Sequence, residues 1–418
     1  MVRERAIIIG VNINNQENFN ESMEELKGLA SACDIEVVGR VEQNLKVYNK
    51  AYCIGTGKVK EVVEELAKCN ARTVIFDNEL SPSQLRNLEK SLNCRILDRT
   101  YLILEIFKSR AKTREAMLQV EVACLKYLLP RLVGSNAELG RQGGGAGLRN
   151  KGAGETKLEL DRRKIEEKLA FLNKELDGLQ NERSTQRSKR NKVGLKNVAL
   201  VGYTNAGKST LINAFVEDSN KGLDKKVFEK DMLFATLETS VRNIMLKDKN
   251  EILLSDTVGF VSKLPHDLVK AFRSTLMEVK HADLLLHVVD VSNENYKEHI
   301  RVTNETLEQI GADNIPTIYV FNKADINEMA IPMIEEGNIY LSAKNRVGII
   351  ELSNLISERL FSDYIESSFF IPYDKGNIVS YLNEHARVKF IEYGSDGTLL
   401  KVDCKERDYN KLSQYLCK

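Results

Sequence analysis

The chain lacks the features that mark secreted, zinc-binding and membrane-spanning proteins. It has no tryptophan, only 6 prolines and 5 histidines, and its 7 cysteines form no Cys-x-x-Cys pair. These absences argue against a disulfide framework and against a zinc site. No run of residues approaches the roughly 18 apolar positions of a membrane-spanning helix, and the apolar run near the N-terminus is too short for a signal peptide. We therefore expect a cytoplasmic protein without a membrane span.

A glycine-rich loop between an apolar strand and a helix carries the strongest chemical signal. Residues 198–201 read Val-Ala-Leu-Val, and Gly202 to Ser209 read Gly-Tyr-Thr-Asn-Ala-Gly-Lys-Ser. Such a loop turns backbone N–H groups onto the α- and β-phosphates, and the N-terminus of the following helix adds its dipole. Lys208 would reach the β- and γ-phosphates, and the Ser209 hydroxyl would hold Mg²⁺. The pattern predicts a nucleoside triphosphate site.

Two later segments favour GTP over ATP, because a phosphate loop alone does not distinguish them. The strand at 317–321 ends in Asn-Lys-Ala-Asp. The carboxylate of Asp325 can accept two hydrogen bonds from guanine N1–H and N2–H₂, a donor pair that adenine lacks. The backbone of Ser342 to Lys344 would meet guanine O6. Both segments follow predicted strands, and doubly wound sheets bind their ligands at such strand ends.

A third segment at a strand end would face the γ-phosphate. In Asp-Thr-Val-Gly, Asp256 would assist Mg²⁺ and the N–H of Gly259 would meet the γ-phosphate. Together these segments resemble the Ras-like GTPase superfamily, over roughly residues 196 to 363. That resemblance implies a first switch in Phe-Ala-Thr-Leu-Glu-Thr, where Thr236 would bind Mg²⁺ and contact the γ-phosphate in the GTP state.

One position departs from the best-known GTPases. They carry a water-orienting glutamine directly after the glycine, whereas this chain has Phe260, whose side chain cannot aim a water. Hydrolysis by the isolated protein should be slow, because unassisted and partner-stimulated GTPases differ by about 10⁵ in rate, roughly 7 kcal/mol of barrier. One candidate source of the missing activation is a macromolecular partner. The other is a potassium ion held beside the phosphates by Asn205, a residue that equally suits a simple turn.

A second glycine-rich segment differs from the first by its basic side chains. Seven of the fifteen residues from Gly140 to Gly154 are glycine. Ordering such a backbone costs about 1 to 2 kcal/mol per residue, with few apolar side chains to offset it, so we expect a flexible loop. Its cationic and amide side chains suit binding to folded RNA, and they are Arg141, Gln142, Arg149 and Lys151. A plain flexible linker is the alternative interpretation.

Apolar residues at helical spacing flank this loop on both sides. The first stripe comprises Leu104, Phe107, Ala111, Leu118, Leu125, Leu128 and Leu132, and the second comprises Leu158, Ile165, Leu169, Leu172, Leu176 and Leu179. They predict an antiparallel helical hairpin with the loop at its tip, and a helix over 157–190 would be about 50 Å long. Residues 141–192 contain 14 Lys or Arg and 8 Asp or Glu, an excess of six in a chain whose net charge is +1. Positive potential is therefore concentrated here.

The loop and the start of the helix after it resemble the HflX family of ribosome-associated GTPases. The resemblance rests on Gly-Ala-Gly-Glu-Thr-Lys-Leu-Glu-Leu-Asp-Arg-Arg at 152–163, on Asp-Thr-Val-Gly-Phe followed by Leu-Pro-His-Asp-Leu at 264–268, and on Phe-Ala-Thr-Leu at 234–237. It covers roughly residues 5 to 363 and departs at positions 150–151, where relatives commonly have glycine and proline. It implies a ribosome-stimulated GTPase that binds the large (50S) subunit, points its hairpin toward the peptidyl transferase region, and splits or rescues stalled ribosomes.

Two alternatives stay open beside this function. The chain would also suit a GTP-regulated factor in assembly of the large subunit, in which slow hydrolysis acts as a timer. Some family members are reported to act on ATP through their N-terminal region. The candidate there, Gly-Thr-Gly-Lys at 55–58, lacks the full loop spacing, and a turn is the preferred interpretation.

The order of expected strands and helices predicts an α/β protein in four parts. A small α/β domain (1–100) precedes the long antiparallel helical hairpin (101–195, tip loop 140–154), and a Ras-like P-loop GTPase domain (196–363) precedes a small α+β domain (364–418). In the first domain we expect strands at 6–11, 35–41, 73–76 and 95–97 and helices at 59–69 and 82–92.

The predicted site binds GTP or GDP with Mg²⁺, with potassium as a further candidate. The predicted partners are the large ribosomal subunit and its rRNA, and we expect a monomer. The expected nucleotide-binding residues are Gly202, Tyr203, Thr204, Asn205, Ala206, Gly207, Lys208, Ser209, Thr210, Asp256, Gly259, Asn322, Lys323, Asp325, Ser342, Ala343 and Lys344. The expected catalytic residues are Lys208, Thr236 and Gly259, and the expected metal ligands are Ser209, Thr236 and Asp256.

Overall fold

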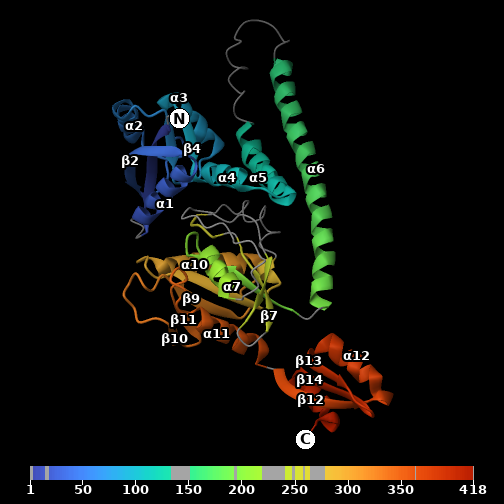
Figure 1. Ribbon diagram of the computed structural model, residues 1–418. Helices are drawn as coiled ribbons and strands as arrows, with labels where there is room; N and C mark the ends of the chain where they lie inside the picture. The colour runs from blue at the N-terminus through green and yellow to red at the C-terminus, as the bar shows by residue number, and fades with distance from the viewer. Residues whose placement is uncertain are drawn as a thin grey trace.

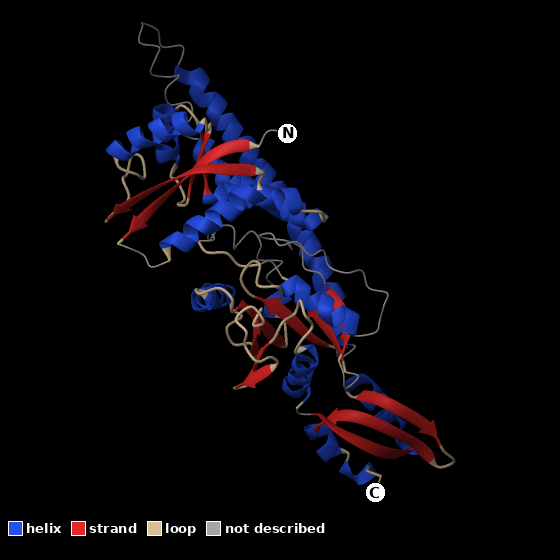
Figure 2. Cartoon of the chain, turned by 60° about the vertical axis from the view of Figure 1, so that its left-hand side comes forward, coloured by secondary structure: helices blue, strands red, loops and turns tan. Residues whose placement is uncertain are grey.

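Three sheets organise the chain in the computed structural model, which confirms the predicted α/β class. The structure describes residues 3–14, 18–132, 151–192, 195–218, 241–246, 250–257, 259–263, 278–362 and 364–417. Figure 1 shows the N-terminal domain above the GTPase domain, helix α6 running beside them, and the C-terminal domain at the far end. Figure 2 shows the same order after rotation. In these ranges no helix is both long and apolar enough to cross a membrane.

A parallel four-stranded sheet forms the core of the N-terminal domain, in the order β2-β1-β3-β4. Its strands are β1 (Glu4–Ile13), β2 (Ile35–Leu45), β3 (Thr73–Phe76) and β4 (Arg95–Asp98). Its helices are α1 (Phe19–Ala32), α2 (Thr56–Cys69), α3 (Pro82–Leu92) and α4 (Arg99–Arg110). Along β1, Ala6 and Ile8 pack against α1 and α4, whereas Ile7 and Ile9 pack against α2 and α3. Helices therefore cover both faces, as is usual for parallel sheets.

Helix α4 packs in this core and not in the hairpin. Leu102, Ile106 and Phe107 are buried in the same cluster as the apolar side chains of α1. The chain then leaves the helical conformation at 111–113 before the next helix begins. The apolar stripe expected to continue from residue 101 is thus divided between two helices, and the core of the N-terminal domain also includes Val120 and Ala123 of the second one.

Helices α5 (Arg114–Leu132) and α6 (Lys151–Lys192) lie side by side in antiparallel orientation (Figure 1). Their ion pairs run in opposite residue order, Arg114 with Glu175 at 2.8 Å and Glu121 with Lys168 at 2.5 Å. The buried contact between the helices consists of Leu118, Val122, Leu172 and Leu176. At about 1.5 Å per residue, the 42 residues of α6 span about 63 Å.

The tip of the hairpin lies mostly outside the described residues. This applies to Arg141, Gln142 and Arg149, three of the four predicted RNA-binding side chains. The fourth, Lys151, begins α6. The helix therefore starts earlier than expected, since the glycine-rich loop was expected to continue to Gly154.

A seven-stranded sheet forms the GTPase domain, in the order β10-β11-β9-β8-β5-β7-β6. Only the outer pairs, β6 with β7 and β10 with β11, are antiparallel. Its strands are β5 (Lys196–Val201), β6 (Val241–Met245), β7 (Glu251–Ser255), β8 (Leu284–Asp290), β9 (Thr317–Asn322), β10 (Met333–Glu335) and β11 (Asn338–Tyr340). Helices α7 (Lys208–Asp218) and α11 (Ile349–Phe361) pack on one face, and α10 (Tyr296–Ile310) packs on the other.

The C-terminal domain is an antiparallel three-stranded sheet in the order β12-β14-β13. Its elements are β12 (Tyr364–Pro372), η1 (Tyr373–Lys375), α12 (Gly376–His385), β13 (Arg387–Tyr393), β14 (Gly397–Lys405), α13 (Glu406–Lys411) and η2 (Ser413–Tyr415). Phe369 and Ile371 of β12 are fully buried with Leu382 of α12, so one face of the sheet forms this small core.

Candidate functional site

The phosphate loop joins the central strand β5 to α7 in a conformation that only glycine allows at two positions. Gly202 has φ +143, and a Cβ there would lie 2.2 Å from the carbonyl oxygen of Val288. Gly207 has φ +94, and a Cβ there would lie 2.2 Å from Nδ2 of Asn322. Both positions combine a left-handed backbone with close approach of a neighbouring strand end, so larger residues are excluded. Asn205, between them, also has a positive φ of 63, which asparagine tolerates.

Lys208 lies folded into the loop and is ready to receive an anion. Its side chain is buried, and its Nζ donates hydrogen bonds to the carbonyl oxygens of Gly202 at 2.9 Å and Tyr203 at 2.8 Å. Burial lowers the pKa of Lys208 to about 8, against the opposing effect of the Asp256 charge. A bound phosphate would stabilise the charged ammonium more strongly than the two carbonyl dipoles do.

Oxygen ligands suitable for Mg²⁺ meet at the start of α7. The Ser209 hydroxyl donates to Oδ2 of Asp256 at 3.3 Å, and the backbone N–H of Thr257 donates to Oδ1 at 3.0 Å. Asp256 is fully buried at the end of β7. Hydroxyl and carboxylate oxygens are the donors that Mg²⁺ prefers beside phosphates. These residues therefore fit the predicted metal, whereas Thr236, the third predicted ligand, lies outside the described residues.

The two guanine-recognition segments are tied to the phosphate loop by one amide side chain. Asn322 donates through Nδ2 to the carbonyl oxygen of Ala206 at 2.9 Å, and its Oδ1 accepts the backbone N–H of Ala343 at 2.9 Å. The backbone N–H of Ser342 donates to Val347 at 3.1 Å. Because Ser342 and Ala343 are both engaged, the expected contact with guanine O6 would involve the N–H of Lys344.

The residues expected to read and flank the guanine base lie at the same strand ends. Lys323 forms an ion pair with Asp290 at 2.7 Å. Oδ2 of Asp325 accepts a hydrogen bond from the side-chain amide of Asn345 at 3.0 Å. The structure therefore brings the phosphate loop, the Asp256 segment and both guanine segments to one edge of the sheet.

The segment after Asp256, whose described residues 259–263 we call the second switch, begins directly against the phosphate loop. The carbonyl oxygen of Phe260 accepts the N–H of Thr204 at 2.7 Å, and the N–H of Phe260 donates to Gly202 at 3.2 Å. A Cβ on Gly259 would lie 2.8 Å from the Thr204 side chain and 3.1 Å from Nζ of Lys208. The Phe260 side chain is 3 % exposed and points into the core of the GTPase domain, so it cannot orient a water at the γ-phosphate.

Sequence reasoning missed two polar groups beside the loop. Burial, together with the charge of Lys208, lowers the pKa of His287 to about 3, so this imidazole is neutral. Its Nδ1 finds no hydrogen-bond partner among the described residues. The hydroxyl of Tyr203 donates to Glu25, which lies 178 residues away in the N-terminal domain. A histidine in an apolar strand and a glutamate in a distant helix carry no local signal for such positions.

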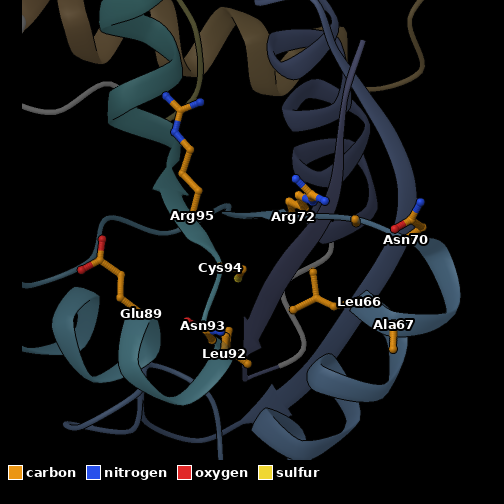
Figure 3. A pocket seen from close by; sticks show the side chains of 10 residues that line it. Leu66, Ala67, Asn70, Arg72, Glu89, Leu92, Asn93, Cys94 and Arg95 are labelled. Atoms are coloured by element: carbon orange, nitrogen blue, oxygen red, sulfur yellow. The ribbon is translucent and has the colours of Figure 1, made fainter. Parts of the chain in front are cut away.

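Two features of the N-terminal domain lie apart from this site. An open pocket at the amino ends of β3 and β4 is bordered by Arg72, Cys94 and Arg95 among ten residues (Figure 3), none of which belongs to the predicted nucleotide site. The Gly-Thr-Gly-Lys segment begins α2, where Gly55 is the N-cap and Lys58 pairs with Glu61 at 2.6 Å. Its geometry is that of a helix start.

Protein-family models match most of the chain. Three family models match consecutive parts of the chain: GTP-binding GTPase N-terminal at 20–108, GTP-binding GTPase Middle Region at 110–190 and 50S ribosome-binding GTPase at 197–323. A solved GTP-binding protein from Sulfolobus solfataricus, in complex with GDP, is 23% identical with a TM-score of 0.43, covering 85% of this chain and 98% of that one.

Curated relatives match nearly the full chain. GTPase HflX of Caldanaerobacter subterraneus subsp. tengcongensis is 45% identical over 401 residues, which cover 96% of this chain and 91% of the relative. GTPase HflX of Escherichia coli is 39% identical over 416 residues, covering 98% and 95% respectively. Identity at this level and coverage confirms the resemblance drawn from the motifs. The chain belongs to the GTPase HflX family and is a GTP-hydrolysing enzyme with a 50S ribosome-binding GTPase domain.

Proposed function

We propose that this GTPase acts as a cytosolic monomer that binds the large ribosomal subunit, hydrolyses GTP faster when bound, and splits or rescues stalled ribosomes. The observation that carries the proposal is the burial of the Phe260 side chain in the domain core. Without a water-orienting side chain at this position, the isolated protein lacks one usual part of a GTPase site. An activator must supply the missing water-orienting group or order the residues of the site.

The α5–α6 hairpin supports a ribosomal activator. Helix α6 is 42 residues long, and the stretch from 141 to 192 carries an excess of six positive charges. Positive charge concentrated on one extended element favours binding to the phosphates of RNA. Arg141, Gln142, Arg149 and Lys151, around the tip, would contact the rRNA.

Two ions belong to the proposed reaction. Ser209 and Thr236 would hold Mg²⁺ directly with the support of Asp256, and Mg²⁺ would neutralise charge that develops on the phosphates. Potassium beside Asn205 would supply part of the same electrostatic stabilisation. Hydrolysis rates measured in equal concentrations of KCl and NaCl test the second ion, and equal rates would remove it from the proposal.

Sedimentation of intact ribosomes tests the splitting activity. Ribosomes are mixed with the protein and either GTP or a non-hydrolysable analogue, then separated on a sucrose gradient. Free subunits with both nucleotides are expected if binding drives splitting. Co-sedimentation with large subunits and no loss of intact ribosomes would favour the assembly factor.

A loop variant separates the hairpin from the nucleotide site. Shortening residues 140–154 should leave nucleotide affinity intact and abolish ribosomal stimulation and splitting. A control variant keeps the parent length of the loop and replaces Arg141 and Arg149 with serine. It separates the effect of charge from the effect of the hairpin's length. Loss of GTP binding in the shortened variant would contradict the assignment of the two functions to separate parts.

A further inference from the structure

A pocket of about 700 Å³ lies between the last turns of α2 and α3 and the residues that lead into β3 and β4 (Figure 3). Both helices stop at an asparagine in the left-handed conformation, Asn70 with φ 47° and Asn93 with φ 48°. Each asparagine is followed by one residue and then by an arginine, Arg72 or Arg95. The volume is in the range of about 300 to 1,000 Å³ that small-molecule sites usually have.

Arg5 and Arg72 occupy neighbouring positions on the face of the sheet that α2 and α3 cover. The N–H of Arg72 donates to the carbonyl oxygen of Arg5 at 3.3 Å, which extends the parallel pairing of β1 with β3 by one residue. Paired residues of parallel strands point to the same side, and the strands lie about 4.8 Å apart. Arg5 shares its side with Ile7 and Ile9, which pack against α2 and α3. Burial raises the pKa of Cys69, at the end of α2, and the charge of Arg5 opposes this shift.

Neither of these two guanidinium groups has a hydrogen-bond or ion-pair partner among the described residues. Of the carboxylates nearby, Glu65 pairs with Lys68 at 3.5 Å. Glu89 lies on the far side of Cys94 from Arg72 (Figure 3). Burial raises the pKa of Glu89, the opposite of what an arginine partner would do. Like charges side by side are unfavourable, so this face favours an anion.

Arg95, at the same edge of the sheet, is neutralised by a neighbour. It forms an ion pair with Glu4 at 3.0 Å and donates to the Tyr101 hydroxyl at 3.0 Å, both on the face that α4 covers. Figure 3 shows its side chain directed away from Leu92 and Cys94. The two faces therefore differ, because the arginine on one face has a carboxylate partner and the two on the other face have none within the described ranges.

We propose that this pocket binds a small phosphomonoester whose phosphate group is held by Arg5 and Arg72. Arginine matches phosphate well, because its N–H groups donate in pairs to two oxygens. Asn70 and Asn93 also line the pocket, and their side-chain amides have no partner in the part of the chain that the structure describes. They can hydrogen bond to hydroxyl groups of the ligand. None of the ten lining residues is aromatic, so a nucleobase would find no ring to stack on. A phosphorylated sugar or polyol therefore fits better than a nucleotide.

Calorimetric titration of the full-length protein with glycerol 3-phosphate tests this site. The protein is first saturated with GDP and Mg²⁺, so that the phosphate loop is already filled. We expect saturable binding to the parent protein and about 10- to 100-fold weaker binding to Arg5→Gln and to Arg72→Gln, because each variant lacks one charged hydrogen-bond donor. Since both arginines would contact the same phosphate, their effects should not be additive in the double variant.

Arg95→Gln is the matched control, because Arg95 lies at the same edge and pairs with Glu4 instead. Its affinity for glycerol 3-phosphate should change by less than about twofold. Melting temperatures with and without the ligand separate lost binding from lost folding. The ligand should raise the melting temperature of the parent protein and of Arg95→Gln, and it should not raise that of Arg72→Gln.

Three outcomes would overturn the proposal. The first is unchanged affinity in the double variant of Arg5 and Arg72. The second is the absence of saturable binding with both glycerol 3-phosphate and inorganic phosphate. The third is tighter binding of ATP than of glycerol 3-phosphate at the same two arginines, which would make the ligand a nucleotide. The test uses no ribosome and keeps the protein in its GDP state, so it is independent of the proposed splitting activity.

Discussion

The N-terminal and GTPase domains are both built on parallel strands, yet they use the carboxyl ends of those strands in different ways. In the GTPase domain these ends are lined by glycine backbone and by Lys208, Asp256 and Asp325, which belong to the predicted nucleotide site. In the N-terminal domain, Asp77 follows β3 and Arg99 follows β4. These two residues form an ion pair, and Asp77 also pairs with Lys263 of the neighbouring domain.

The difference shows that the carboxyl ends of parallel strands can hold either a nucleotide or the side chains of a neighbouring domain. Strand ends in open α/β sheets collect polar groups whatever binds there. A nucleotide that must enter and leave needs backbone donors, and the loop that presents them can pack against Val288 and Asn322 only because Gly202 and Gly207 lack a Cβ. A permanent contact can instead be filled by long side chains that neutralise one another. In the N-terminal domain, the carboxyl end of the sheet therefore contacts the second switch instead of a ligand. We call this end the docking edge, and we call the carboxyl end of the GTPase-domain sheet the nucleotide edge.

The largest predicted effect is loss of stability at the docking edge. Arg99→Ala leaves Glu25 and Asp77 buried without their shared cation, and breaking a buried ion pair in this way costs about 3 to 5 kcal/mol. Denaturant unfolding measures the change. Arg95→Ala, at the other end of β4, is the control, because its pair with Glu4 is exposed and pairs of that kind contribute roughly 0 to 1 kcal/mol. Equal losses for both variants would contradict the distinction.

At the nucleotide edge, we expect a substitution to reduce activity strongly and stability little, whereas Arg99→Ala mainly reduces stability. Lys208→Ala removes a buried ammonium whose pKa is already lowered to about 8, so its charge does not stabilise the empty protein. We expect hydrolysis to fall at least about 10²- to 10³-fold, the usual loss when a group that stabilises transition-state charge is removed. The free energy of unfolding should change far less than in Arg99→Ala. A comparable loss of stability would show that both edges are structural.

Local patterns were enough to predict the nucleotide edge. The spacing from Gly202 to Ser209 determines a loop that only glycine can close, and the predicted helix 82–92 matches α3, where Ser81 and Gln84 form a capping box and Pro82 begins the helix. Each of these features depends on residues a few positions apart. They can therefore be read without knowledge of the tertiary fold.

The docking edge depends on contacts that no local pattern reveals. Glu25 and Tyr203 are 178 residues apart, and Glu25 has the spacing of an ordinary solvent-facing helix residue. Val261 leaves its own domain and joins the core of another, which an apolar residue type alone does not indicate. The apolar stripe from Leu104 to Leu132 likewise did not indicate the break between two helices at 111–113, because helical spacing can continue across two helices.

Base selectivity should respond at Asp325 and not at the docking edge. Asp325→Asn replaces the carboxylate that we expect to accept from guanine N1–H and N2–H₂ with an amide that can accept only one of these bonds. Hydrogen bonds to a charged group contribute about 1.5 to 3 kcal/mol, so GDP affinity should fall about 10- to 100-fold. Xanthosine diphosphate, whose C2 oxygen can accept from the new amide, should compete better than before. If Glu25→Gln changed this selectivity to the same extent, the two edges would not be separate in function.

The smallest predicted effect is a pH dependence that only the nucleotide edge shows. Burial lowers the pKa of Lys208 to about 8 in the empty protein, and a bound phosphate should raise it. Below pH 8 the ammonium is already charged and GDP affinity is nearly constant. Above pH 8 binding must take up a proton, so affinity falls toward tenfold per pH unit, equivalent to about 1.4 kcal/mol. Asp77 has a lowered pKa and stays ionised over this range, so stability at the docking edge should not follow the same curve.

Titration calorimetry at pH 7 and pH 9, in two buffers with different ionisation enthalpies, measures the affinity and the proton uptake together. Constant affinity without proton uptake would mean that Lys208 remains charged in the empty loop, and the phosphate site would then resemble the docking edge in its electrostatics.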